Sequence, residues 1–271
     1  MAVAAKTKRL LRGLVPPLAV RAYRALVPRA APPFSMKVEG NYGTWQAAVV
    51  VCGDGYQAEE PVQREARITR SLLSSSSSAP LNGMEIRALA GILSCGTPTT
   101  VLDFGGGVGQ HFFRLGPHLA VRSWVVCETE AMAKEGRASF ARPGLEFVSS
   151  LDEVASRRFD VAFTAGAVQY VPDPLAVLTK LSDLAERIVI NRLPVAPWSE
   201  NRLTTIRVHE AGRAEWVCPQ WLFSETWWGK QLENLGLQAT LRWAAPDDVV
   251  LVDGEPLEFR GMVLSKKKPA S

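Results

Sequence analysis

From residue 99 to residue 191, short apolar runs alternate with stretches in which apolar residues recur every three or four positions. A short apolar run predicts a buried strand, and the periodic stretches predict amphipathic helices. The expected strands are 99–104, 123–128, 145–148, 159–164 and 187–191, and the expected helices are 108–119, 131–140, 151–157 and 174–184. This alternation favours right-handed βαβ crossovers and therefore an α/β, doubly wound, mostly parallel sheet.

The pattern changes near the C-terminus. Residues 238–245 and 261–266 predict two further strands, which are joined by the polar stretch 246–258. Asp253-Gly254 within that stretch is a hairpin-type turn signal. The sheet is therefore expected to finish in an antiparallel edge pair.

Residues 34–98 do not continue the strand–helix alternation, and they predict a helical and aromatic extension. Aromatic residues and glycines are concentrated between positions 34 and 56, and helices are expected at 64–73 and 81–93. The serine run at 74–78 predicts a break between these two helices.

The first 33 residues predict a basic, amphipathic arm. Between positions 1 and 38 there are eight lysines and arginines and no acidic residue. Two short helices are expected, at 7–15 and 18–26, separated by Pro16-Pro17 because proline disfavours a continuous helix. Leucines and valines interleaved with arginines suit the surface of a membrane that carries anionic lipid. They equally suit a helix that packs on the domain and exposes its basic face.

Composition narrows the class of protein. The 271 residues, 47% hydrophobic and 21% charged, are typical of one globular α/β domain with an appended segment. The net charge of +4 is too small to indicate nucleic-acid binding. The four cysteines share no metal-ligand spacing, so we expect no metal site and a reducing, cytoplasmic location. The sequence predicts neither a transmembrane helix nor a secretory signal.

The clearest functional signal is Val101-Leu-Asp-Phe-Gly-Gly-Gly-Val-Gly109. An apolar strand ends here, glycines follow, and a helix begins. Glycine tolerates positive φ and lets the backbone approach a ligand closely, and open α/β sheets bind ligands at the carboxyl ends of their strands. Glu128 ends the next strand about 20 residues later, the spacing of a carboxylate that accepts hydrogen bonds from ribose hydroxyls.

Several ligands are compatible with a glycine loop at this place. The loop lacks the Lys-Ser/Thr ending of a P-loop, which disfavours a nucleoside triphosphate. Gln110-His111-Phe112 follows Gly109, so the sequence departs from the Gly-x-Gly-x-x-Gly of dinucleotide sites. The Asp-x-Gly-x-Gly spacing suits a ligand with an α-amino acid end, whose ammonium group can meet a carboxylate and backbone carbonyls. A dinucleotide site and a purely structural loop remain alternatives.

On these residues the chain resembles the class I S-adenosylmethionine-dependent methyltransferases. The resemblance implies a Rossmann-like, seven-stranded sheet and S-adenosyl-L-methionine as the cofactor. Asp152 stands one or two positions late for an aspartate that binds the adenine amino group. The cofactor-binding residues that the resemblance implies are Asp103, Phe104, Gly105, Gly106, Gly107, Gly109, Glu128, Ser150, Leu151 and Ala165.

A narrower resemblance is to a family of bacterial methyltransferases of unknown acceptor from surface-polysaccharide gene neighbourhoods. It departs at Asn191-Arg192, where an acidic residue is expected ahead of the arginine, so substrate choice is expected to differ if that position touches the acceptor. The resemblance implies methylation of a glycan, lipid-linked sugar or related small molecule in polysaccharide biosynthesis. The segments that carry it are residues 14–17, 39–45, 55–56, 101–107, 168–170, 201–204 and 218–224.

The candidate residues on the acceptor side are Gln169, Tyr170 and His209. Methyl transfer is an in-line displacement in which positioning supplies much of the rate, and a base is needed only for a hydroxyl or a protonated amine. Gln169 and Tyr170 follow the fourth strand, beside the methyl group in this fold, although Tyr170 equally suits a packing role. His209 lies in an insertion at about 192–222 that in this fold often covers the acceptor, and is a candidate base or an ordinary surface histidine. The aromatic and arginine side chains of the insertion suit a pocket for a sugar or an anionic acceptor, or the filling of space under a long loop.

The expected organisation is a basic arm at 1–33, an extension at 34–98 and a methyltransferase domain at 99–268. The expected partners are a small-molecule or glycan acceptor and, through residues 1–30, an anionic membrane surface at the inner face of the membrane; nucleic acid is not expected. Two rivals are a non-catalytic protein of the same fold that binds the cofactor or acts as a scaffold, and an NAD(P)-dependent reductase.

Overall fold

The computed structural model describes residues 34–74 and 79–267. The predicted basic arm, with its two helices and its membrane contact, lies outside the described residues. Within the described ranges, no helix is both long and apolar enough to span a membrane.

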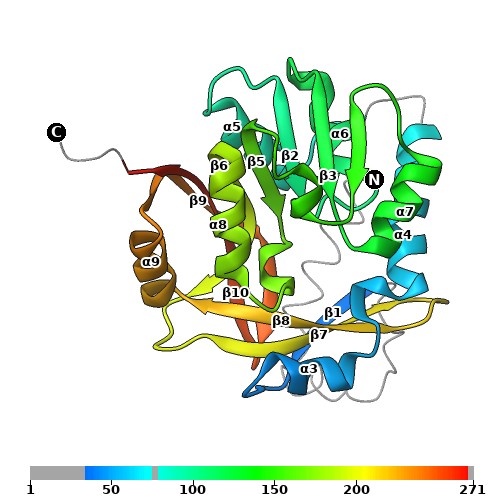
Figure 1. Ribbon diagram of the computed structural model, residues 1–271. Helices are drawn as coiled ribbons and strands as arrows, with labels where there is room; N and C mark the ends of the chain where they lie inside the picture. Colours follow the sequence, from blue (N-terminus) through cyan, green and yellow to red (C-terminus); the bar gives the residue numbers. More distant parts are fainter. Residues whose placement is uncertain (1–33, 75–78, 268–271) are drawn as a thin grey trace, which may run out of the picture. The chain divides into compact units, whose positions relative to one another are not determined.

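The central sheet has the strand order β4-β3-β2-β5-β6-β10-β9 (Figure 1). The pairings β4-β3, β3-β2, β2-β5 and β5-β6 are all parallel, whereas β10 runs antiparallel to both of its neighbours. The prediction of a Rossmann-like, mostly parallel, seven-stranded sheet with an antiparallel strand towards one edge is therefore confirmed for the described residues. Its strands are β2 (Thr100–Phe104), β3 (Ser123–Cys127), β4 (Leu145–Val148), β5 (Phe159–Ala165), β6 (Ala185–Ala196), β9 (Leu237–Val252) and β10 (Glu255–Lys266).

Helices cover both faces of this sheet. Successive side chains of a buried strand point to opposite faces, so Val101 packs into one hydrophobic core and Leu102 into the other. The core that contains Val101 is covered by α4 (Glu59–Ser74), α5 (Gly83–Leu93), α6 (Gln110–Leu115) and α7 (Glu130–Ser139). The core that contains Leu102 is covered by α8 (Pro174–Leu184) and α9 (Glu225–Asn234). The sheet is doubly wound, as predicted.

Three further strands extend β6 beyond the central sheet: β1 (Phe34–Glu39), β7 (Arg202–Glu210) and β8 (Trp216–Ser224). β7 and β8 are antiparallel, and β8 joins β6 through the parallel pairs Val195↔Phe223 and Ala196↔Ser224. In Figure 1 these strands lie below the central sheet, with α3 (Trp45–Cys52) beneath them. We refer to β1, β7, β8 and α3 as the lower layer.

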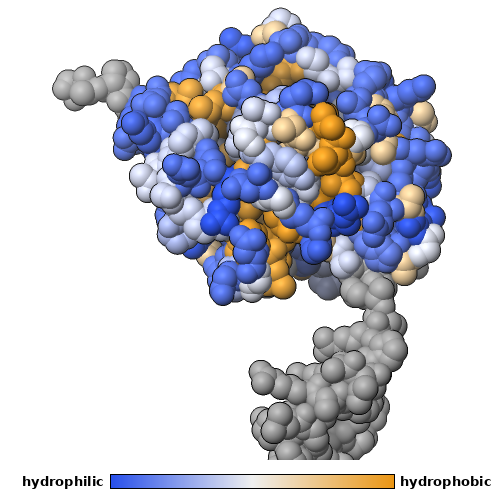
Figure 2. Space-filling view, turned by 90° about the horizontal axis from the view of Figure 1, so that it is seen from below, coloured by the Kyte–Doolittle hydropathy of each residue, from blue (hydrophilic) through white to orange (hydrophobic). Residues whose placement is uncertain are grey.

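The sequence did not predict the strands of the lower layer. The segment at about 192–222 was predicted as an insertion on the acceptor side, and 34–98 as a helical and aromatic extension. Instead, the 192–222 segment continues β6, forms β7 and begins β8, and β1 lies in the extension. The view from below in Figure 2 shows apolar patches among polar residues, and the exposed apolar side chains of the chain include Val50 and Val51 of α3.

The C-terminal hairpin is longer than the sequence predicted. The polar stretch 246–258 was expected as a turn region, but pairing continues to Val252↔Glu255, and only Asp253 and Gly254, with φ of 54° and 86°, form the turn. Four apolar side chains of this part of the hairpin are buried against Leu222 of the lower layer, which explains why the strands persist: Val250, Val252, Leu257 and Phe259.

Candidate functional site

The glycine loop connects β2 to α6. Gly105, Gly107 and Gly109 have φ of +76°, +59° and +93°, values that side chains with a Cβ rarely tolerate. A Cβ at Gly105 would lie 2.1 Å from the Cβ of Ala167, in the turn after β5. The loop therefore requires glycine, and its backbone lies directly against the carboxyl end of a neighbouring strand.

Asp103 lies beneath the loop and is fully buried. Its carboxylate accepts a hydrogen bond of 3.0 Å from Trp124 Nε1 and lies 3.0 Å from His111 Nδ1. Burial by itself lowers the pKa of the His111 imidazole, but the carboxylates of Asp103, Glu65 and Glu85 together outweigh it, so that pKa lies above its usual value. A Cβ at Gly106 would lie 2.3 Å from Asp103 Oδ2. Asp103 is thus engaged with Trp124 and His111 beneath the loop, and its contact with the cofactor stays a prediction.

Glu128 follows β3 and lies beside the loop, as the sequence predicted. Its Oε1 accepts a hydrogen bond of 3.0 Å from the amide of Gly107, and its Oε2 accepts one of 2.8 Å from the amide of Thr129. Burial raises the pKa of the carboxyl to about 7, against the lowering effect of the two amides, and the negative charges of Glu65 and Asp103 raise it further. Glu128 therefore lies in a negatively charged environment, and its two hydrogen bonds come from backbone amides rather than from a basic side chain.

The residues after β4 play local structural roles. Ser150 caps the short 3₁₀ helix η3 (Leu151–Val154), and the side chain of Leu151 is buried in the core. Asp152 is exposed and its carboxylate pairs at 2.7 Å with Lys180 on α8. The Asp152 carboxylate is thus occupied by an ion pair at the surface. Ser150 and Leu151, which the sequence predicted as cofactor-binding residues, lie at the carboxyl end of β4.

Two buried polar groups flank the last residue of β5, Ala165. Thr164 Oγ1 and Gln169 Oε1 have no hydrogen-bond partner among the described residues, although Gln169 Nε2 donates to the carbonyl of Arg192 at 3.3 Å. Buried polar groups nearly always have a hydrogen-bond partner. Two buried polar atoms without one near the end of β5 therefore fit a polar ligand bound between the glycine loop and the turn after β5. Phe104, at the end of β2, packs partly buried against the core beside this turn.

An aromatic cluster faces the turn after β5. Tyr170 belongs to the 3₁₀ helix η4 (Val168–Tyr170), and its ring lies edge-on to Tyr56 with centroids 5.0 Å apart; the ring of Trp216 is 4.8 Å from Tyr56. Cys218, on the same strand as Trp216, is buried in this cluster. Burial raises the pKa of both phenols and of the Cys218 thiol, so none of the three is ionised at neutral pH.

Further polar groups border the aromatic cluster. Gln220, two residues after Cys218 on β8, is fully buried, and both of its amide atoms lack a partner among the described residues. Arg192 pairs with Asp248, with Nη2 and Oδ1 3.0 Å apart, and its guanidinium lies 4.6 Å from the centroid of Phe259. The charge of Arg192 is therefore already neutralised, and the region offers hydrogen bonds rather than a free cation.

His209 is not brought together with these residues. It lies on β7 and pairs with Glu215 at 3.2 Å, with its side chain one third exposed. Val208, its neighbour, packs in the cluster that includes Tyr56 and Tyr170. Because successive side chains of a strand point to opposite faces, His209 faces away from that cluster. The geometry places it as a surface histidine and does not support the predicted role as a base.

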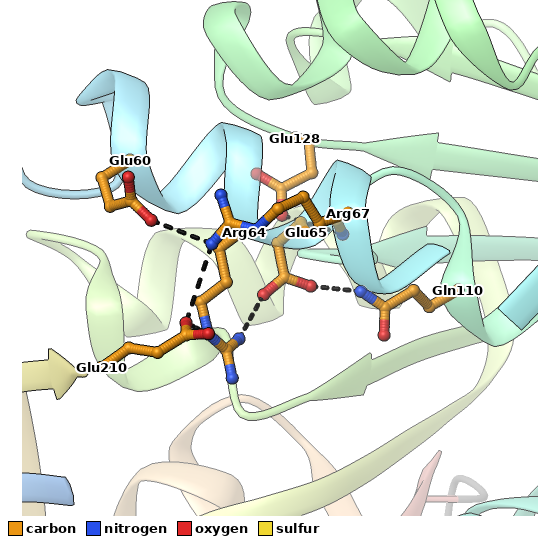
Figure 3. Close-up of polar contacts among 8 residues, drawn as sticks. Glu60, Arg64, Glu65, Arg67, Gln110, Glu128 and Glu210 are labelled. Carbon is orange, nitrogen blue, oxygen red and sulfur yellow. Dashed lines mark hydrogen bonds and ion pairs between the residues drawn. The ribbon is translucent and has the colours of Figure 1, made fainter. Parts of the chain in front are cut away.

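Helix α4 crosses above the glycine loop and contributes residues that the sequence did not single out (Figure 3). The carboxylate of Glu65 accepts a hydrogen bond from Gln110, the first residue of α6, and lies 3.6 Å from the position of a Cβ on Gly107. Arg64 Nη1 pairs with Glu65 Oε1 at 2.8 Å. The sequence carried no signal for this arrangement, because which face of α4 meets the loop is decided by tertiary packing.

Comparisons with known proteins agree with this geometry. No protein-family model matches the chain, and no curated protein sequence matches it. Solved structures do match. A 1,6-didemethyltoxoflavin-N1-methyltransferase from Burkholderia thailandensis, with 1,6-didemethyltoxoflavin and S-adenosylhomocysteine bound, has a TM-score of 0.53 at 17% identity, over 86% of this chain and 94% of its own.

Two further methyltransferases have comparable similarity. An S-adenosylmethionine-dependent methyltransferase from Clostridium acetobutylicum has a TM-score of 0.51 at 12% identity, over 76% of this chain and 99% of its own. The CcbJ methyltransferase from Streptomyces caelestis has a TM-score of 0.50 at 15% identity, over 74% and 96%. The chain therefore has the Rossmann-like fold of S-adenosylmethionine-dependent methyltransferases.

Proposed function

We propose that the protein is an S-adenosylmethionine-dependent methyltransferase. The observation that carries this proposal is the acidic surrounding of the glycine loop, where Glu128 and Glu65 lie beside Gly107 above the buried Asp103. S-adenosylmethionine carries a sulfonium and an ammonium group, which these carboxylates attract. The pyrophosphate of NAD(P) would be repelled there, which disfavours the reductase alternative.

The residues of the site fit the cofactor. Glu128 is the proposed acceptor of hydrogen bonds from ribose hydroxyls, and the glycine loop lets the backbone approach the ligand without a Cβ in the way. The orphan groups of Thr164 and Gln169 offer partners beside Ala165, and Ser150 and Leu151 border the carboxyl end of β4, where adenine is expected. When bound, the cofactor supplies an electrophilic methyl group for an in-line displacement.

The acceptor side suits a neutral, hydrogen-bonding small molecule. Tyr56, Tyr170 and Trp216 offer aromatic surface for the apolar face of a sugar ring. Both amide atoms of Gln220, and Oε1 of Gln169, have no partner among the described residues. This supports the glycan, lipid-linked sugar or related acceptor that the narrower family resemblance implies, in polysaccharide biosynthesis.

The same residues narrow the proposed chemistry further. The raised pKa values of Tyr56, Tyr170 and Cys218 mean that none of these three groups in the aromatic cluster acts as a base at neutral pH. The contribution of the cluster is therefore to position the acceptor and exclude water. An acceptor whose attacking atom needs no base suits this aromatic cluster best. Within the proposed class, the neutral amine of an amino sugar has that property.

We also propose contact with an anionic membrane surface at the inner face of the membrane through residues 1–30, and a division at residue 99 between the extension and the methyltransferase domain. The membrane proposal rests on the eight basic residues between positions 1 and 38, and the exposed valines of α3 add apolar surface to the described part.

Binding and comparative metabolite measurements test the function. Calorimetric titration is expected to show binding of S-adenosylmethionine and no binding of NAD⁺ or NADPH; the reverse result would overturn the proposal. A strain that lacks the protein is expected to lose a methyl group from a sugar-containing metabolite, detected by untargeted mass spectrometry. If the cofactor binds but no metabolite loses a methyl group, the non-catalytic alternative is favoured.

A further inference from the structure

Three carboxylates surround the glycine loop, and one of them comes from outside the strands and turns that form it. Asp103 packs against Gly106, Glu128 accepts a hydrogen bond from the amide of Gly107, and Glu65 of α4 lies 3.6 Å from the position of a Cβ on Gly107. Figure 3 shows Glu65 and Glu128. Glu65 is part-buried, with 27% of its side chain exposed. It is also close enough to Tyr56 to help raise the pKa of that phenol. Glu65 therefore stands between the glycine loop and the aromatic cluster.

The charges of these carboxylates are unequally balanced. Asp103 has the imidazole of His111 at 3.0 Å. Glu65 has the guanidinium of Arg64 at 2.8 Å, but Arg64 also lies 3.4 Å from Glu210 at the end of β7. Glu128 accepts hydrogen bonds from the backbone amides of Gly107 and Thr129. Negative charge therefore accumulates on the side of the loop where Glu65 and Glu128 lie.

A second arginine does not cancel this charge. Arg67 Nη2 lies 2.9 Å from Glu60 and 3.7 Å from Glu210, so its charge is shared between these two carboxylates. Together the two arginines meet three glutamates of α4 and β7, namely Glu60, Glu65 and Glu210. Glu128 adds a fourth carboxylate without adding a cation.

We propose that Glu65 is a specificity-determining residue that makes the site prefer S-adenosylmethionine to its product, S-adenosylhomocysteine. This inference rests on the proposed function. Methyl transfer turns a sulfonium into a neutral sulfide, so the net charge of the ligand falls from +1 to zero. A carboxylate that faces the loop in a part-buried place interacts more strongly with the charged form than with the neutral form. Glu65 thereby favours binding of the donor and release of the product.

A purely structural role for Glu65 predicts a different behaviour. Its hydrogen bond with Gln110 and its ion pair with Arg64 tie α4 to the start of α6. If that were its whole contribution, replacing it would weaken the binding of both ligands equally, because both need the loop in the same position.

The test compares the two ligands by calorimetry in the full-length wild type, in Glu65→Gln and in Glu60→Gln. Glu60 is the matched control, because it lies on the same helix and pairs with Arg67. We expect Glu65→Gln to raise the Kd of S-adenosylmethionine about tenfold and that of S-adenosylhomocysteine less than about twofold. Glu60→Gln should leave the ratio of the two Kd values unchanged.

Three results overturn the inference. An equal rise of the Kd for both ligands shows a structural role, and unchanged Kd values for both ligands show that Glu65 does not sense the sulfonium. Absence of binding of either ligand to the wild type overturns the proposed function itself. If Glu65→Gln does not fold, the two Kd values of the wild type are compared at low and at high salt. Salt screens charge interactions, so the preference for S-adenosylmethionine over S-adenosylhomocysteine should fall at high salt. A preference that does not fall contradicts the proposal.

Discussion

The amide of Gly107 donates a hydrogen bond of 3.0 Å to Glu128 Oε1, which joins the glycine loop after β2 to the end of β3 across 21 positions of sequence. The carboxylate is thus held in a fixed place beside the loop. The contact places the two strongest sequence signals for a nucleoside-containing ligand, the loop and the acidic strand end, in one site.

Replacing Glu128 is expected to weaken cofactor binding. Glu128→Ala removes the acceptor proposed for the ribose hydroxyls and frees the amide of Gly107, so the Kd of S-adenosylmethionine should rise by at least about tenfold. Calorimetry measures this directly. Glu146→Ala is the control, because Glu146 on β4 pairs with Arg157 at the surface. An unchanged Kd in Glu128→Ala would refute the assignment of this carboxylate.

Cofactor affinity is expected to depend on pH through Glu128. A cationic ligand favours the ionised carboxylate, and with a pKa of about 7 that form is about 90% populated at pH 8 and about 10% at pH 6. The Kd should therefore rise up to about ninefold between pH 8 and pH 6. Glu128→Gln should show a flatter profile, whereas identical profiles in the two proteins would contradict the prediction.

The same carboxylate affects stability in a predictable direction. The folded-state pKa of about 7 lies above the usual 4.5, so the folded protein holds the proton more tightly than the unfolded chain. The free energy of unfolding should then decrease as pH rises from about 4.5 to about 7. Urea denaturation across this range should show a smaller decrease in Glu128→Gln, and an equal decrease would be contrary evidence.

Two glycines give a matched pair of stability predictions. A Cβ at Gly261 on β10 would lie 1.9 Å from the indole ring of Trp243, whereas a Cβ at Gly229 in α9 would meet nothing within 4 Å. Gly261→Ala should destabilise the protein by about 3 kcal/mol because the core must shift. Gly229→Ala should stabilise it by about 0.5–1 kcal/mol because alanine is the better helix former. Urea denaturation of both variants checks the pair, and similar effects would show that the packing argument is wrong.

The ion pair of Arg192 and Asp248 is expected to matter more than an exposed pair. Asp248→Asn leaves the guanidinium of Arg192, only 26% exposed, without its carboxylate partner, at a cost of about 2 kcal/mol. Asp253→Asn breaks the pair with Arg202, but Asp253 is 83% exposed, so a change of less than about 0.5 kcal/mol is expected. Equal losses in thermal denaturation would contradict the role assigned to burial.

The central sheet could be predicted from sequence because its strands are short, buried on both faces and separated by periodic helices. The hairpin was underestimated because Pro246, Asp247 and Asp248 conceal the apolar positions that follow them. β7 and β8 could not be predicted in the same way, because part of what fixes them is distant: Thr205 on β7 donates a hydrogen bond to the carbonyl of Glu39 on β1, at the other end of the chain.

Part of the candidate site could likewise be predicted from the sequence, and part could not. The glycine loop and Glu128 were identifiable because strand ends in an open sheet meet at one edge, whatever the rest of the chain does. Glu65 was not, since its position depends on how α4 packs across the loop. For His209 the sequence left a base and a surface histidine as alternatives, because its distance from the site depends on which face of β7 it occupies, and β7 itself was not predicted. The sequence therefore did not predict which side chains of separate helices and strands come into contact.

The central claim is most directly tested by titrating S-adenosylmethionine into the wild type and into Gly105→Val. The valine would bring a Cβ against Ala167 and strain a backbone with φ of +76°. Gly43→Val is the control, because Gly43 has no atom within 4 Å of a Cβ position. Saturable binding to the wild type and to Gly43→Val, together with its loss in a folded Gly105→Val, is the predicted result. Equal binding to all three proteins, or none to the wild type, would contradict the account.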